Sequence, residues 1–340
     1  MTTTASGAQH DAALPPDLPV HAERGGSRKD ADWDLVTIPE DFGPTHRVVT
    51  RDKRLAFAFA QGDYGSWYFQ DSPFGGPVCH PMIFANDLLF LFYENYDGNT
   101  AEGLHTHEQL TFHSPARPGE LVTFTGQYVE KFVKRGQGYV VLRAEARGED
   151  GRLIVTHRGT EIMRTRVEEV AGRNRGSTPA RAVEARIDES LPVATRAAVG
   201  IPERTGLPPV VRHFTQDQMN TYSWLAEGYR NVHTDHGRAR DSGSERTVVQ
   251  ALQQTGLVVD AMVDFFGPTW FTTGALDLRY VNPAYCGERL TARAAVLGLA
   301  DDGRLELEVW VEKDGGERTV LGWARAEIGQ EASRPVQLLG

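Results

Sequence analysis

The sequence predicts an α+β protein built from two repeats, each an antiparallel sheet wrapped around a long central helix. Three observations support this fold class. Two long apolar segments, 82–96 and 247–266, have the length and composition of buried helices. Each is followed by four segments in which apolar and polar residues alternate, as in strands with one buried face. The two series of segments also match each other in sequence.

The match between the two halves keeps a nearly constant offset. Four residues around one turn recur 168 positions later, namely Pro115 with Pro283, Gly119 with Gly287, Glu120 with Glu288 and Thr123 with Thr291. The last two strands of each half, 139–163 and 304–328, align without a gap at an offset of 165. Two copies of one structural unit explain this better than chance.

The expected elements follow the chain in the same order in both halves. Helix 82–96 precedes strands 104–114, 121–133, 139–147 and 153–164, and helix 247–266 precedes strands 272–281, 288–299, 304–313 and 320–328. Periodicity does not decide between helix and strand for residues 55–60. We expect five parts: a mobile segment 1–33, repeat 34–164, a connector 165–209, repeat 210–330 and a tail 331–340.

Composition and charge exclude several classes of protein. The formal net charge of -10 argues against a nucleic-acid partner. Asp260 and Asp264 interrupt the most apolar run, which favours a core helix over a membrane span. With two cysteines, neither a disulfide framework nor a cysteine zinc site is expected. His105 and His107 share a strand face but lack further ligands at metal spacing, so no metal is expected. No secretory signal is apparent, and we expect a cytoplasmic protein.

Two motifs resemble the MaoC-like hydratase and dehydratase family, whose fold is the double hotdog. The family's helix-entry signature Gly-Phe-Gly-Gly-Pro-Ile-Ala-His-Gly-Met resembles residues 73–82, and its Asp-x-Asn-Pro-Ile-His-x-Asp loop resembles residues 228–235. The resemblance covers most of residues 55–328. It implies an acyl thioester of coenzyme A or acyl carrier protein as substrate and partner, and no cofactor apart from the coenzyme A of the substrate. The family includes hydratases and thioesterases, so the fold alone does not select the reaction.

The departures from the family pattern bear on the reaction. The resemblance places the family's catalytic histidine at His233, but its catalytic aspartate falls on Gly228. In the first repeat Asp63 matches the acid, whereas the histidine falls on Tyr68. The helix-start N–H that holds the thioester oxygen would come from Ala251, while the first repeat has Pro81 there, which has no N–H. Neither repeat therefore carries the complete hydratase set.

The candidate site residues gather in the two loops before the helices. The candidate catalytic residues are His233, Asn231, Gln250, Tyr68 and Asp71, and the candidate substrate-binding residues are Ala251, Gln254, Thr255, Asp63, Trp67 and Arg230. Each has a structural alternative. His233 could cap a helix or strand end, Asn231 could serve turn chemistry, and Gln254 and Thr255 could lie on a solvated helix face. Asp235 is expected to cap a helix or pair with an arginine.

The lost acid favours hydrolysis, because a thioesterase needs a polarised carbonyl and a positioned water rather than a paired acid and base. We therefore expect an acyl-CoA thioesterase. The alternatives are an enoyl-CoA hydratase or 3-hydroxyacyl dehydratase that takes its acid from Asp63 or Asp71, and a non-catalytic acyl-thioester binder. Aromatic residues around Trp67 suggest a bulky apolar acyl group, as in secondary metabolism, although core packing explains them equally well. A homodimer of double hotdogs is expected.

Overall fold

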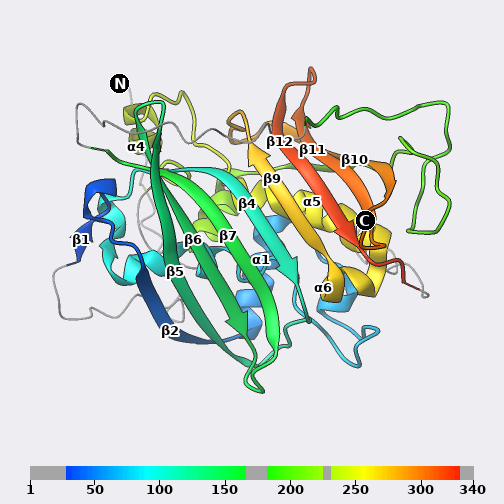
Figure 1. The fold of residues 1–340 in the computed structure, drawn as a ribbon, viewed down its shortest axis with the longest axis horizontal. Coiled ribbons are helices and arrows are strands. Elements are labelled where there is room, and N and C mark those ends of the chain that lie inside the picture. Colours follow the sequence, from blue (N-terminus) through cyan, green and yellow to red (C-terminus); the bar gives the residue numbers. More distant parts are fainter. Residues whose placement is uncertain (1–27, 166–181, 225–230, 330–340) are drawn as a thin grey trace, which may run out of the picture.

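One ten-stranded sheet dominates the computed structural model, which describes residues 28–165, 182–224 and 231–329 (Figure 1). Every pair of neighbouring strands in this sheet is antiparallel. The strand order is β2 (Glu40–Val48), β5 (Leu121–Lys134), β6 (Gln137–Arg147), β7 (Leu153–Met163), β4 (Leu104–Phe112), β9 (Ala275–Tyr280), β12 (Arg318–Ala326), β11 (Leu305–Lys313), β10 (Arg289–Leu299) and β8 (Val210–His213). All eight expected strands are present.

The order of the strands confirms the two repeats. The first five strands belong to the first repeat and the last five to the second, and each half runs in the same internal order outward from the central pair β4–β9. At that pair Leu110 lies opposite Leu276. The outermost strands β2 and β8 were not predicted. A separate short pair joins β1 (Lys29–Asp30) to β3 (Tyr96–Asp97) in parallel.

The central helix of the second repeat is the long one. Helix α5 (Ala251–Phe266) lies behind the sheet in Figure 1 and is buried over almost its whole length. It begins four residues later than expected, because Val248 bridges to Tyr285 and Gln250 is the N-cap in extended geometry. None of the described helices is long and apolar enough to cross a membrane.

The expected long helix 82–96 of the first repeat is wrong. The chain forms only α2 (Ala85–Leu89), followed by the 3₁₀ segment Phe90–Glu94. The aromatic rings of this segment explain the change. Phe90 stacks on Tyr93 at 5.0 Å between ring centroids, and Phe92 packs edge-on against Tyr93 at 4.5 Å. Tertiary packing of large rings overrides the helical pattern here.

Of the other helices, three precede a central helix in the chain, and α6 follows α5. They are α1 (Arg51–Gln61), α3 (Gln216–Trp224), α4 (His236–Asp241) and α6 (Trp270–Thr273), with short 3₁₀ segments at Trp33–Leu35, Ser66–Tyr68, Gly98–Thr100 and Gly267–Thr269. Residues 55–60, left undecided by periodicity, belong to α1. This helix starts at Thr50, whose side chain accepts a hydrogen bond from the Lys53 N–H, and ends at Gly62 in the left-handed region. Helices α1 and α3 pack against each other.

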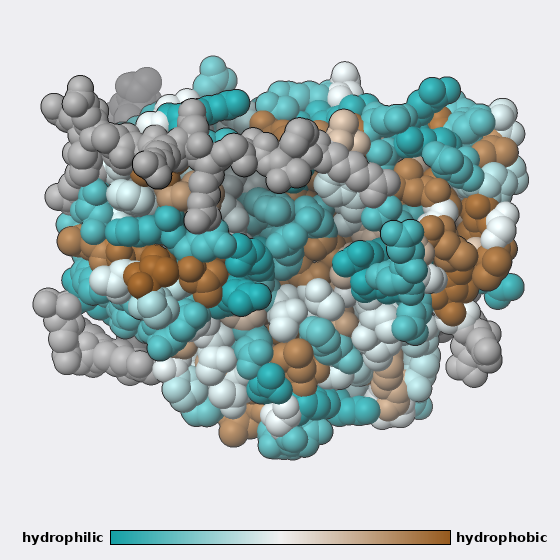
Figure 2. All heavy atoms as spheres, in the orientation of Figure 1, coloured by the Kyte–Doolittle hydropathy of each residue, from teal (hydrophilic) through white to brown (hydrophobic). Residues whose placement is uncertain are grey.

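The two faces of the sheet have different environments. The inner face packs against the helices and shares one hydrophobic core across both repeats. Described residues of the connector cover part of the outer face of the second repeat, where buried Glu308 accepts hydrogen bonds from the Ala185 N–H and from Arg204. Figure 2 shows the outer face, on which hydrophilic side chains predominate over the strands.

Candidate functional site

A tight turn before α5 holds His233. The His233 N–H donates to Asn231 Oδ1 at 2.9 Å, and the Asn231 N–H donates to Thr234 Oγ1 at 3.2 Å. Gln216 of α3 donates to the His233 carbonyl at 2.9 Å. Asn231 therefore shapes the turn, as its alternative interpretation held. Asp235 accepts a hydrogen bond from the Arg238 N–H and caps α4, as expected.

The ring nitrogens of His233 have distinct surroundings. Nδ1 lies 2.6 Å from the carbonyl oxygen of Val248. Because a carbonyl only accepts, Nδ1 carries the proton and Nε2 carries the lone pair. Desolvation lowers the pKa of His233 to about 4, against the opposing hydrogen bond to Val248. The imidazole is therefore neutral at pH 7. No hydrogen bond from Nε2 to another described residue is found.

After α4 the chain returns past His233, because Val248, whose carbonyl His233 contacts, lies three residues before the start of α5. Gln250 is the N-cap but makes no side-chain cap hydrogen bond, since its amide donates to Ser223 Oγ at 2.7 Å. Ala251, the first residue of the helix, is partly exposed. Its N–H has no partner within the helix and points along the positive end of the helix dipole. A neutral imidazole thus contacts the short segment that enters an anion-binding helix start.

The polar residues in the first turns of α5 are buried rather than solvated. Gln253 donates to the Ala60 carbonyl at 2.9 Å, and Gln61 donates back to the Gln253 carbonyl at 3.2 Å. Thr255 Oγ1 lies 2.7 Å from the Tyr280 hydroxyl. Gln254 Oε1 is buried without a hydrogen-bond partner among the described residues. The interpretation of a solvated helix face is therefore wrong.

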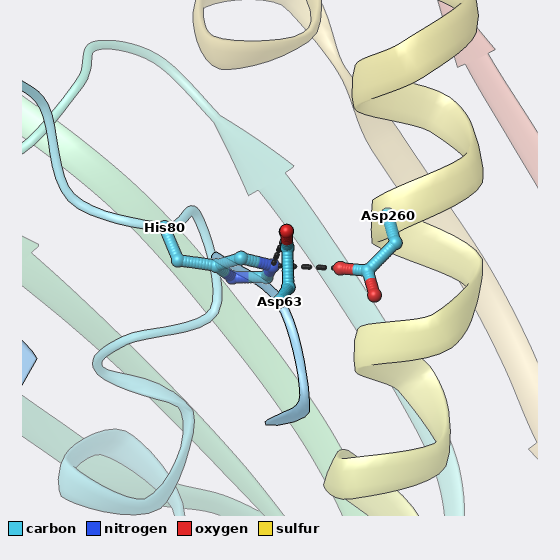
Figure 3. Close-up of side chains that lie close together, drawn as sticks. All are labelled: Asp63, His80 and Asp260. Carbon is cyan, nitrogen blue, oxygen red and sulfur yellow. Dashed lines mark hydrogen bonds and ion pairs between the residues drawn. The ribbon is translucent and has the colours of Figure 1, made fainter. Parts of the chain in front are cut away.

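The corresponding place in the first repeat holds a buried Asp–His–Asp triad of Asp63, His80 and Asp260 (Figure 3). The Met82 N–H donates to His80 Nδ1 at 3.0 Å, so Nε2 carries the proton of the neutral ring. That nitrogen lies 2.9 Å from Asp260 Oδ1 and 3.7 Å from Asp63 Oδ2. Asp260 belongs to α5, so the triad joins the two repeats.

Two carboxylates so close together perturb each other. Burial and the charge of Asp63 raise the pKa of Asp260, while His80 and Arg212 oppose this. Arg212 Nη2 lies 3.4 Å from Asp260 Oδ2. One possible ligand atom from each of the three residues lies within 4.8 Å of the others, which is close enough to hold a metal ion. The sequence analysis considered a metal only at His105 and His107, and the spacing of 180 positions between His80 and Asp260 gives no local signal of this group.

Of the remaining candidates, two are buried, one is exposed, and one falls outside the described residues. Tyr68 and Trp67 are buried, with the Tyr68 ring 5.1 Å from the His80 ring and the Trp67 ring 6.2 Å from Phe271. Asp71 is exposed on its loop. Arg230, and Gly228 at the family's acid position, fall in the segment 225–230 that the structure does not describe.

One hollow of about 950 Å³ is lined by none of these residues. It lies on the sheet, where polar side chains such as Gln109, Arg143 and Asp277 line it. Sequence reasoning missed Asp260 as a site residue and also Glu108, a buried acid of β4. The available signal was a charged residue inside an otherwise apolar helix or on the buried side of a strand.

Comparisons with known proteins establish the fold. No family profile and no curated protein matches the sequence. Among solved structures, a MaoC-like dehydratase superposes with a TM-score of 0.67 at 15% identity, over 86% of this chain and 98% of that one. A putative MaoC domain protein dehydratase from Chloroflexus aurantiacus gives 0.66 at 11% identity, over 89% and 100%.

A third structure names the architecture. A conserved hypothetical protein from Mycobacterium tuberculosis, described as having a double hotdog fold, gives a TM-score of 0.62 at 16% identity, over 87% of this chain and 98% of that one. At this level of identity the likeness concerns the fold. The chain has the double hotdog fold, and its structure is similar to those of MaoC-like dehydratases.

Proposed function

We propose that this protein is an enzyme that acts on an acyl thioester, adding or removing water at the bond next to the thioester carbonyl. One observation carries the proposal: the neutral His233, whose Nε2 holds the lone pair, contacts the carbonyl of Val248, three residues before the helix-start N–H of Ala251. A fold similar to that of MaoC-like dehydratases supports the same reaction class.

The residues would divide the reaction between them. In the hydration direction, His233 Nε2 takes a proton from water while the water oxygen bonds to C3 of the enoyl group. The electrons of the double bond move onto the thioester oxygen, where the Ala251 N–H stabilises the negative charge. The proton on His233 then reaches C2 as the carbonyl re-forms. The carrier of the acyl group, coenzyme A or a carrier protein, stays open.

Thioester hydrolysis is the second candidate, and one observation favours it. Among the described residues, His233 Nδ1 donates its hydrogen bond to the Val248 carbonyl and not to a carboxylate. Hydrolysis needs a base for water and a donor for the carbonyl oxygen, which His233 and Ala251 could supply without a second acid.

One assay separates the two reactions. Saturated and 2-enoyl thioesters are incubated with the protein, and enoyl absorbance and free thiol are followed separately. We expect loss of enoyl absorbance without thiol release. His233→Gln should lower the rate roughly 10²–10⁴-fold, the usual contribution of a general base. His236→Gln, an exposed neighbour in α4, is the matched control. Thiol release from saturated thioesters would establish hydrolysis instead, and silence in both assays would refute both reactions.

A further inference from the structure

The hollow of about 950 Å³ is lined by side chains on the sheet face that points away from the core. Arg143 of β6 identifies this face. Val140 and Leu142, three positions and one position before it, belong to the core that α5 shares. Because successive side chains of a strand point to opposite faces, Arg143 points away from that core, and it is exposed. The sheet therefore separates the Arg143 side chain from α5.

Two rows of residues that pair across the strands line the hollow. The first row consists of Gln127 of β5, Arg143 of β6, Arg158 of β7 and Gln109 of β4. The second row, two residues away along each strand, consists of Thr125, Glu145, Thr156 and Thr111. Residues that lie directly opposite each other on neighbouring strands present their side chains on the same face. Both rows therefore share the face of Arg143.

Two arginines lie directly opposite each other in the first row, Arg143 and Arg158. The Cα atoms of opposite residues in an antiparallel pair are about 4.5–5.5 Å apart, and like charges in this arrangement destabilise a sheet. Arg158 Nη2 lies 3.2 Å from Glu130 Oε1. Arg143 makes no hydrogen bond or ion pair with any other residue that the structure describes. A partner for the arginine pair is therefore missing at Arg143.

The acidic residues that line the hollow do not supply this partner. They are Asp41, Glu145, Asp277 and Glu306. Asp41 and Asp277 each accept a hydrogen bond from a glutamine amide of the first row, at 2.6 Å and 2.8 Å. Glu145 Oε1 lies 2.7 Å from Arg147 Nε. Glu306 belongs to β11, four strands from β7, which is roughly 19 Å at the usual strand spacing.

The side chains around the arginine pair indicate the chemistry of a ligand. Guanidinium groups bind phosphate oxygens through two parallel hydrogen bonds, and two of them on neighbouring strands can share one tetrahedral dianion. A carboxylate would engage one guanidinium and leave the other without a partner. The threonine hydroxyls of the second row both donate and accept, which suits hydroxyl groups on a ligand. A volume of about 950 Å³ leaves room for an organic part beside the phosphate.

We propose that this hollow binds a small phosphate monoester with a hydroxyl-rich organic part, as in a sugar phosphate. The phosphate group lies between Arg143 and Arg158, where it relieves the repulsion of the two like charges. The hydroxyl groups of the organic part meet the threonines of the second row. The site lies across the sheet from α5 and does not rest on the proposed function, so either one can hold without the other.

Titration calorimetry at fixed ionic strength tests the site with ribose 5-phosphate, inorganic phosphate and acetate. We expect ribose 5-phosphate to bind most tightly, phosphate less tightly, and acetate about tenfold or more weaker than phosphate. Arg143→Gln should weaken the binding of ribose 5-phosphate about tenfold or more, as for a lost hydrogen bond between charged groups. Arg143→Lys should give an intermediate affinity, because it keeps the charge but loses the paired hydrogen bonds. Equal affinity for ribose 5-phosphate and phosphate would overturn the organic part of the proposal.

Arg289→Gln is the matched control and should keep the wild-type affinity, because Arg289 is exposed, pairs with Asp314 and does not line the hollow. Thermal unfolding without phosphate gives a second measurement. Arg143→Gln should not lower the melting temperature, since it removes a contact between like charges. A lower melting temperature would mean that the fold itself uses Arg143. That result, the binding of neither phosphate, or unchanged binding in Arg143→Gln would overturn the proposal.

Discussion

At the scale of single residues, His233 gives the most direct prediction. Its lowered pKa means that the ring stays neutral and able to accept a proton until the pH approaches 4. We expect kcat/KM for the enoyl substrate to stay level from pH 7 to about pH 5 and to fall only below that, whereas an unperturbed histidine would titrate near pH 6.5. The pH profile of kcat/KM measures this, with circular dichroism to confirm folding at each pH.

The pH profile of kcat/KM can also contradict the assignment of His233 as the base. His236→Gln should leave the acidic limb where it is in the wild type, because that side chain is exposed and lies outside the proposed site. A limb near pH 6.5 in both proteins would mean that a histidine with an ordinary pKa, and not His233 as the structure places it, is the base.

Some site residues could be predicted from the sequence and others could not. His233 could be identified as a candidate because a loop histidine that precedes an apolar helical segment is recognisable from the local sequence. Glu108 was missed because strand alternation indicates which face a residue occupies but not which side chains from neighbouring strands meet it. Its partner His157 lies 49 positions away, on a strand whose register is set by the whole sheet.

At the scale of elements, the strands were easier to predict than the helices. Alternation within 104–114 or 304–313 is a local signal, and the strands lie within a few residues of the expected bounds. The helix expected at 82–96 failed because its apolar residues include large rings that pack best from a 3₁₀ segment. Periodicity indicates that a segment is buried, but it does not specify the geometry that its neighbours require.

Helix α5 packs closely on α1 at Gly256. A larger residue at this position of α5 should therefore change the stability of the protein. A Cβ atom there would lie 2.3 Å from the Gln61 amide, which donates a hydrogen bond to the Gln253 carbonyl. Gly256→Ala should lower the free energy of unfolding by about 1–3 kcal/mol through overpacking. Helix propensity alone would raise it by up to about 1 kcal/mol. Urea unfolding measures the difference.

A double variant separates the clash from other effects at Gly256. Gln61→Ala removes the side chain that the new methyl group would meet, at the cost of its own hydrogen bond to the Gln253 carbonyl. Gly256→Ala should therefore be less destabilising in the Gln61→Ala background than in the wild type. If the two changes are additive, the close approach of α5 to Gln61 does not limit the residue at 256.

At the scale of the whole molecule, the internal repeat made the division of the fold into two similar halves predictable from the sequence. The offset of 168 positions predicted two equal halves, and the strand order bears this out. The sequence offset could not predict the side-chain contacts that differ between the two repeats. The triad takes Asp63 and His80 from one repeat and Asp260 from the other, and the position equivalent to His80 in the second repeat is Gln250, which bonds Ser223 instead.

The triad also makes the stability of the joined repeats depend on pH. Because burial and Asp63 raise the pKa of Asp260 above 3.8, the folded state holds a proton that the unfolded state releases. This contribution is fully present below pH 3.8 and is lost as the pH rises through the folded pKa.

Asp260→Asn imitates the protonated acid and keeps an oxygen for His80 Nε2–H. Its free energy of unfolding relative to wild type should therefore increase as the pH rises above 3.8, as measured by urea unfolding. Asp314→Asn, in an exposed ion pair with Arg289, should show no such trend. A relative stability that falls with rising pH would mean that the ionised Asp260, paired with His80 and Arg212, holds the repeats together.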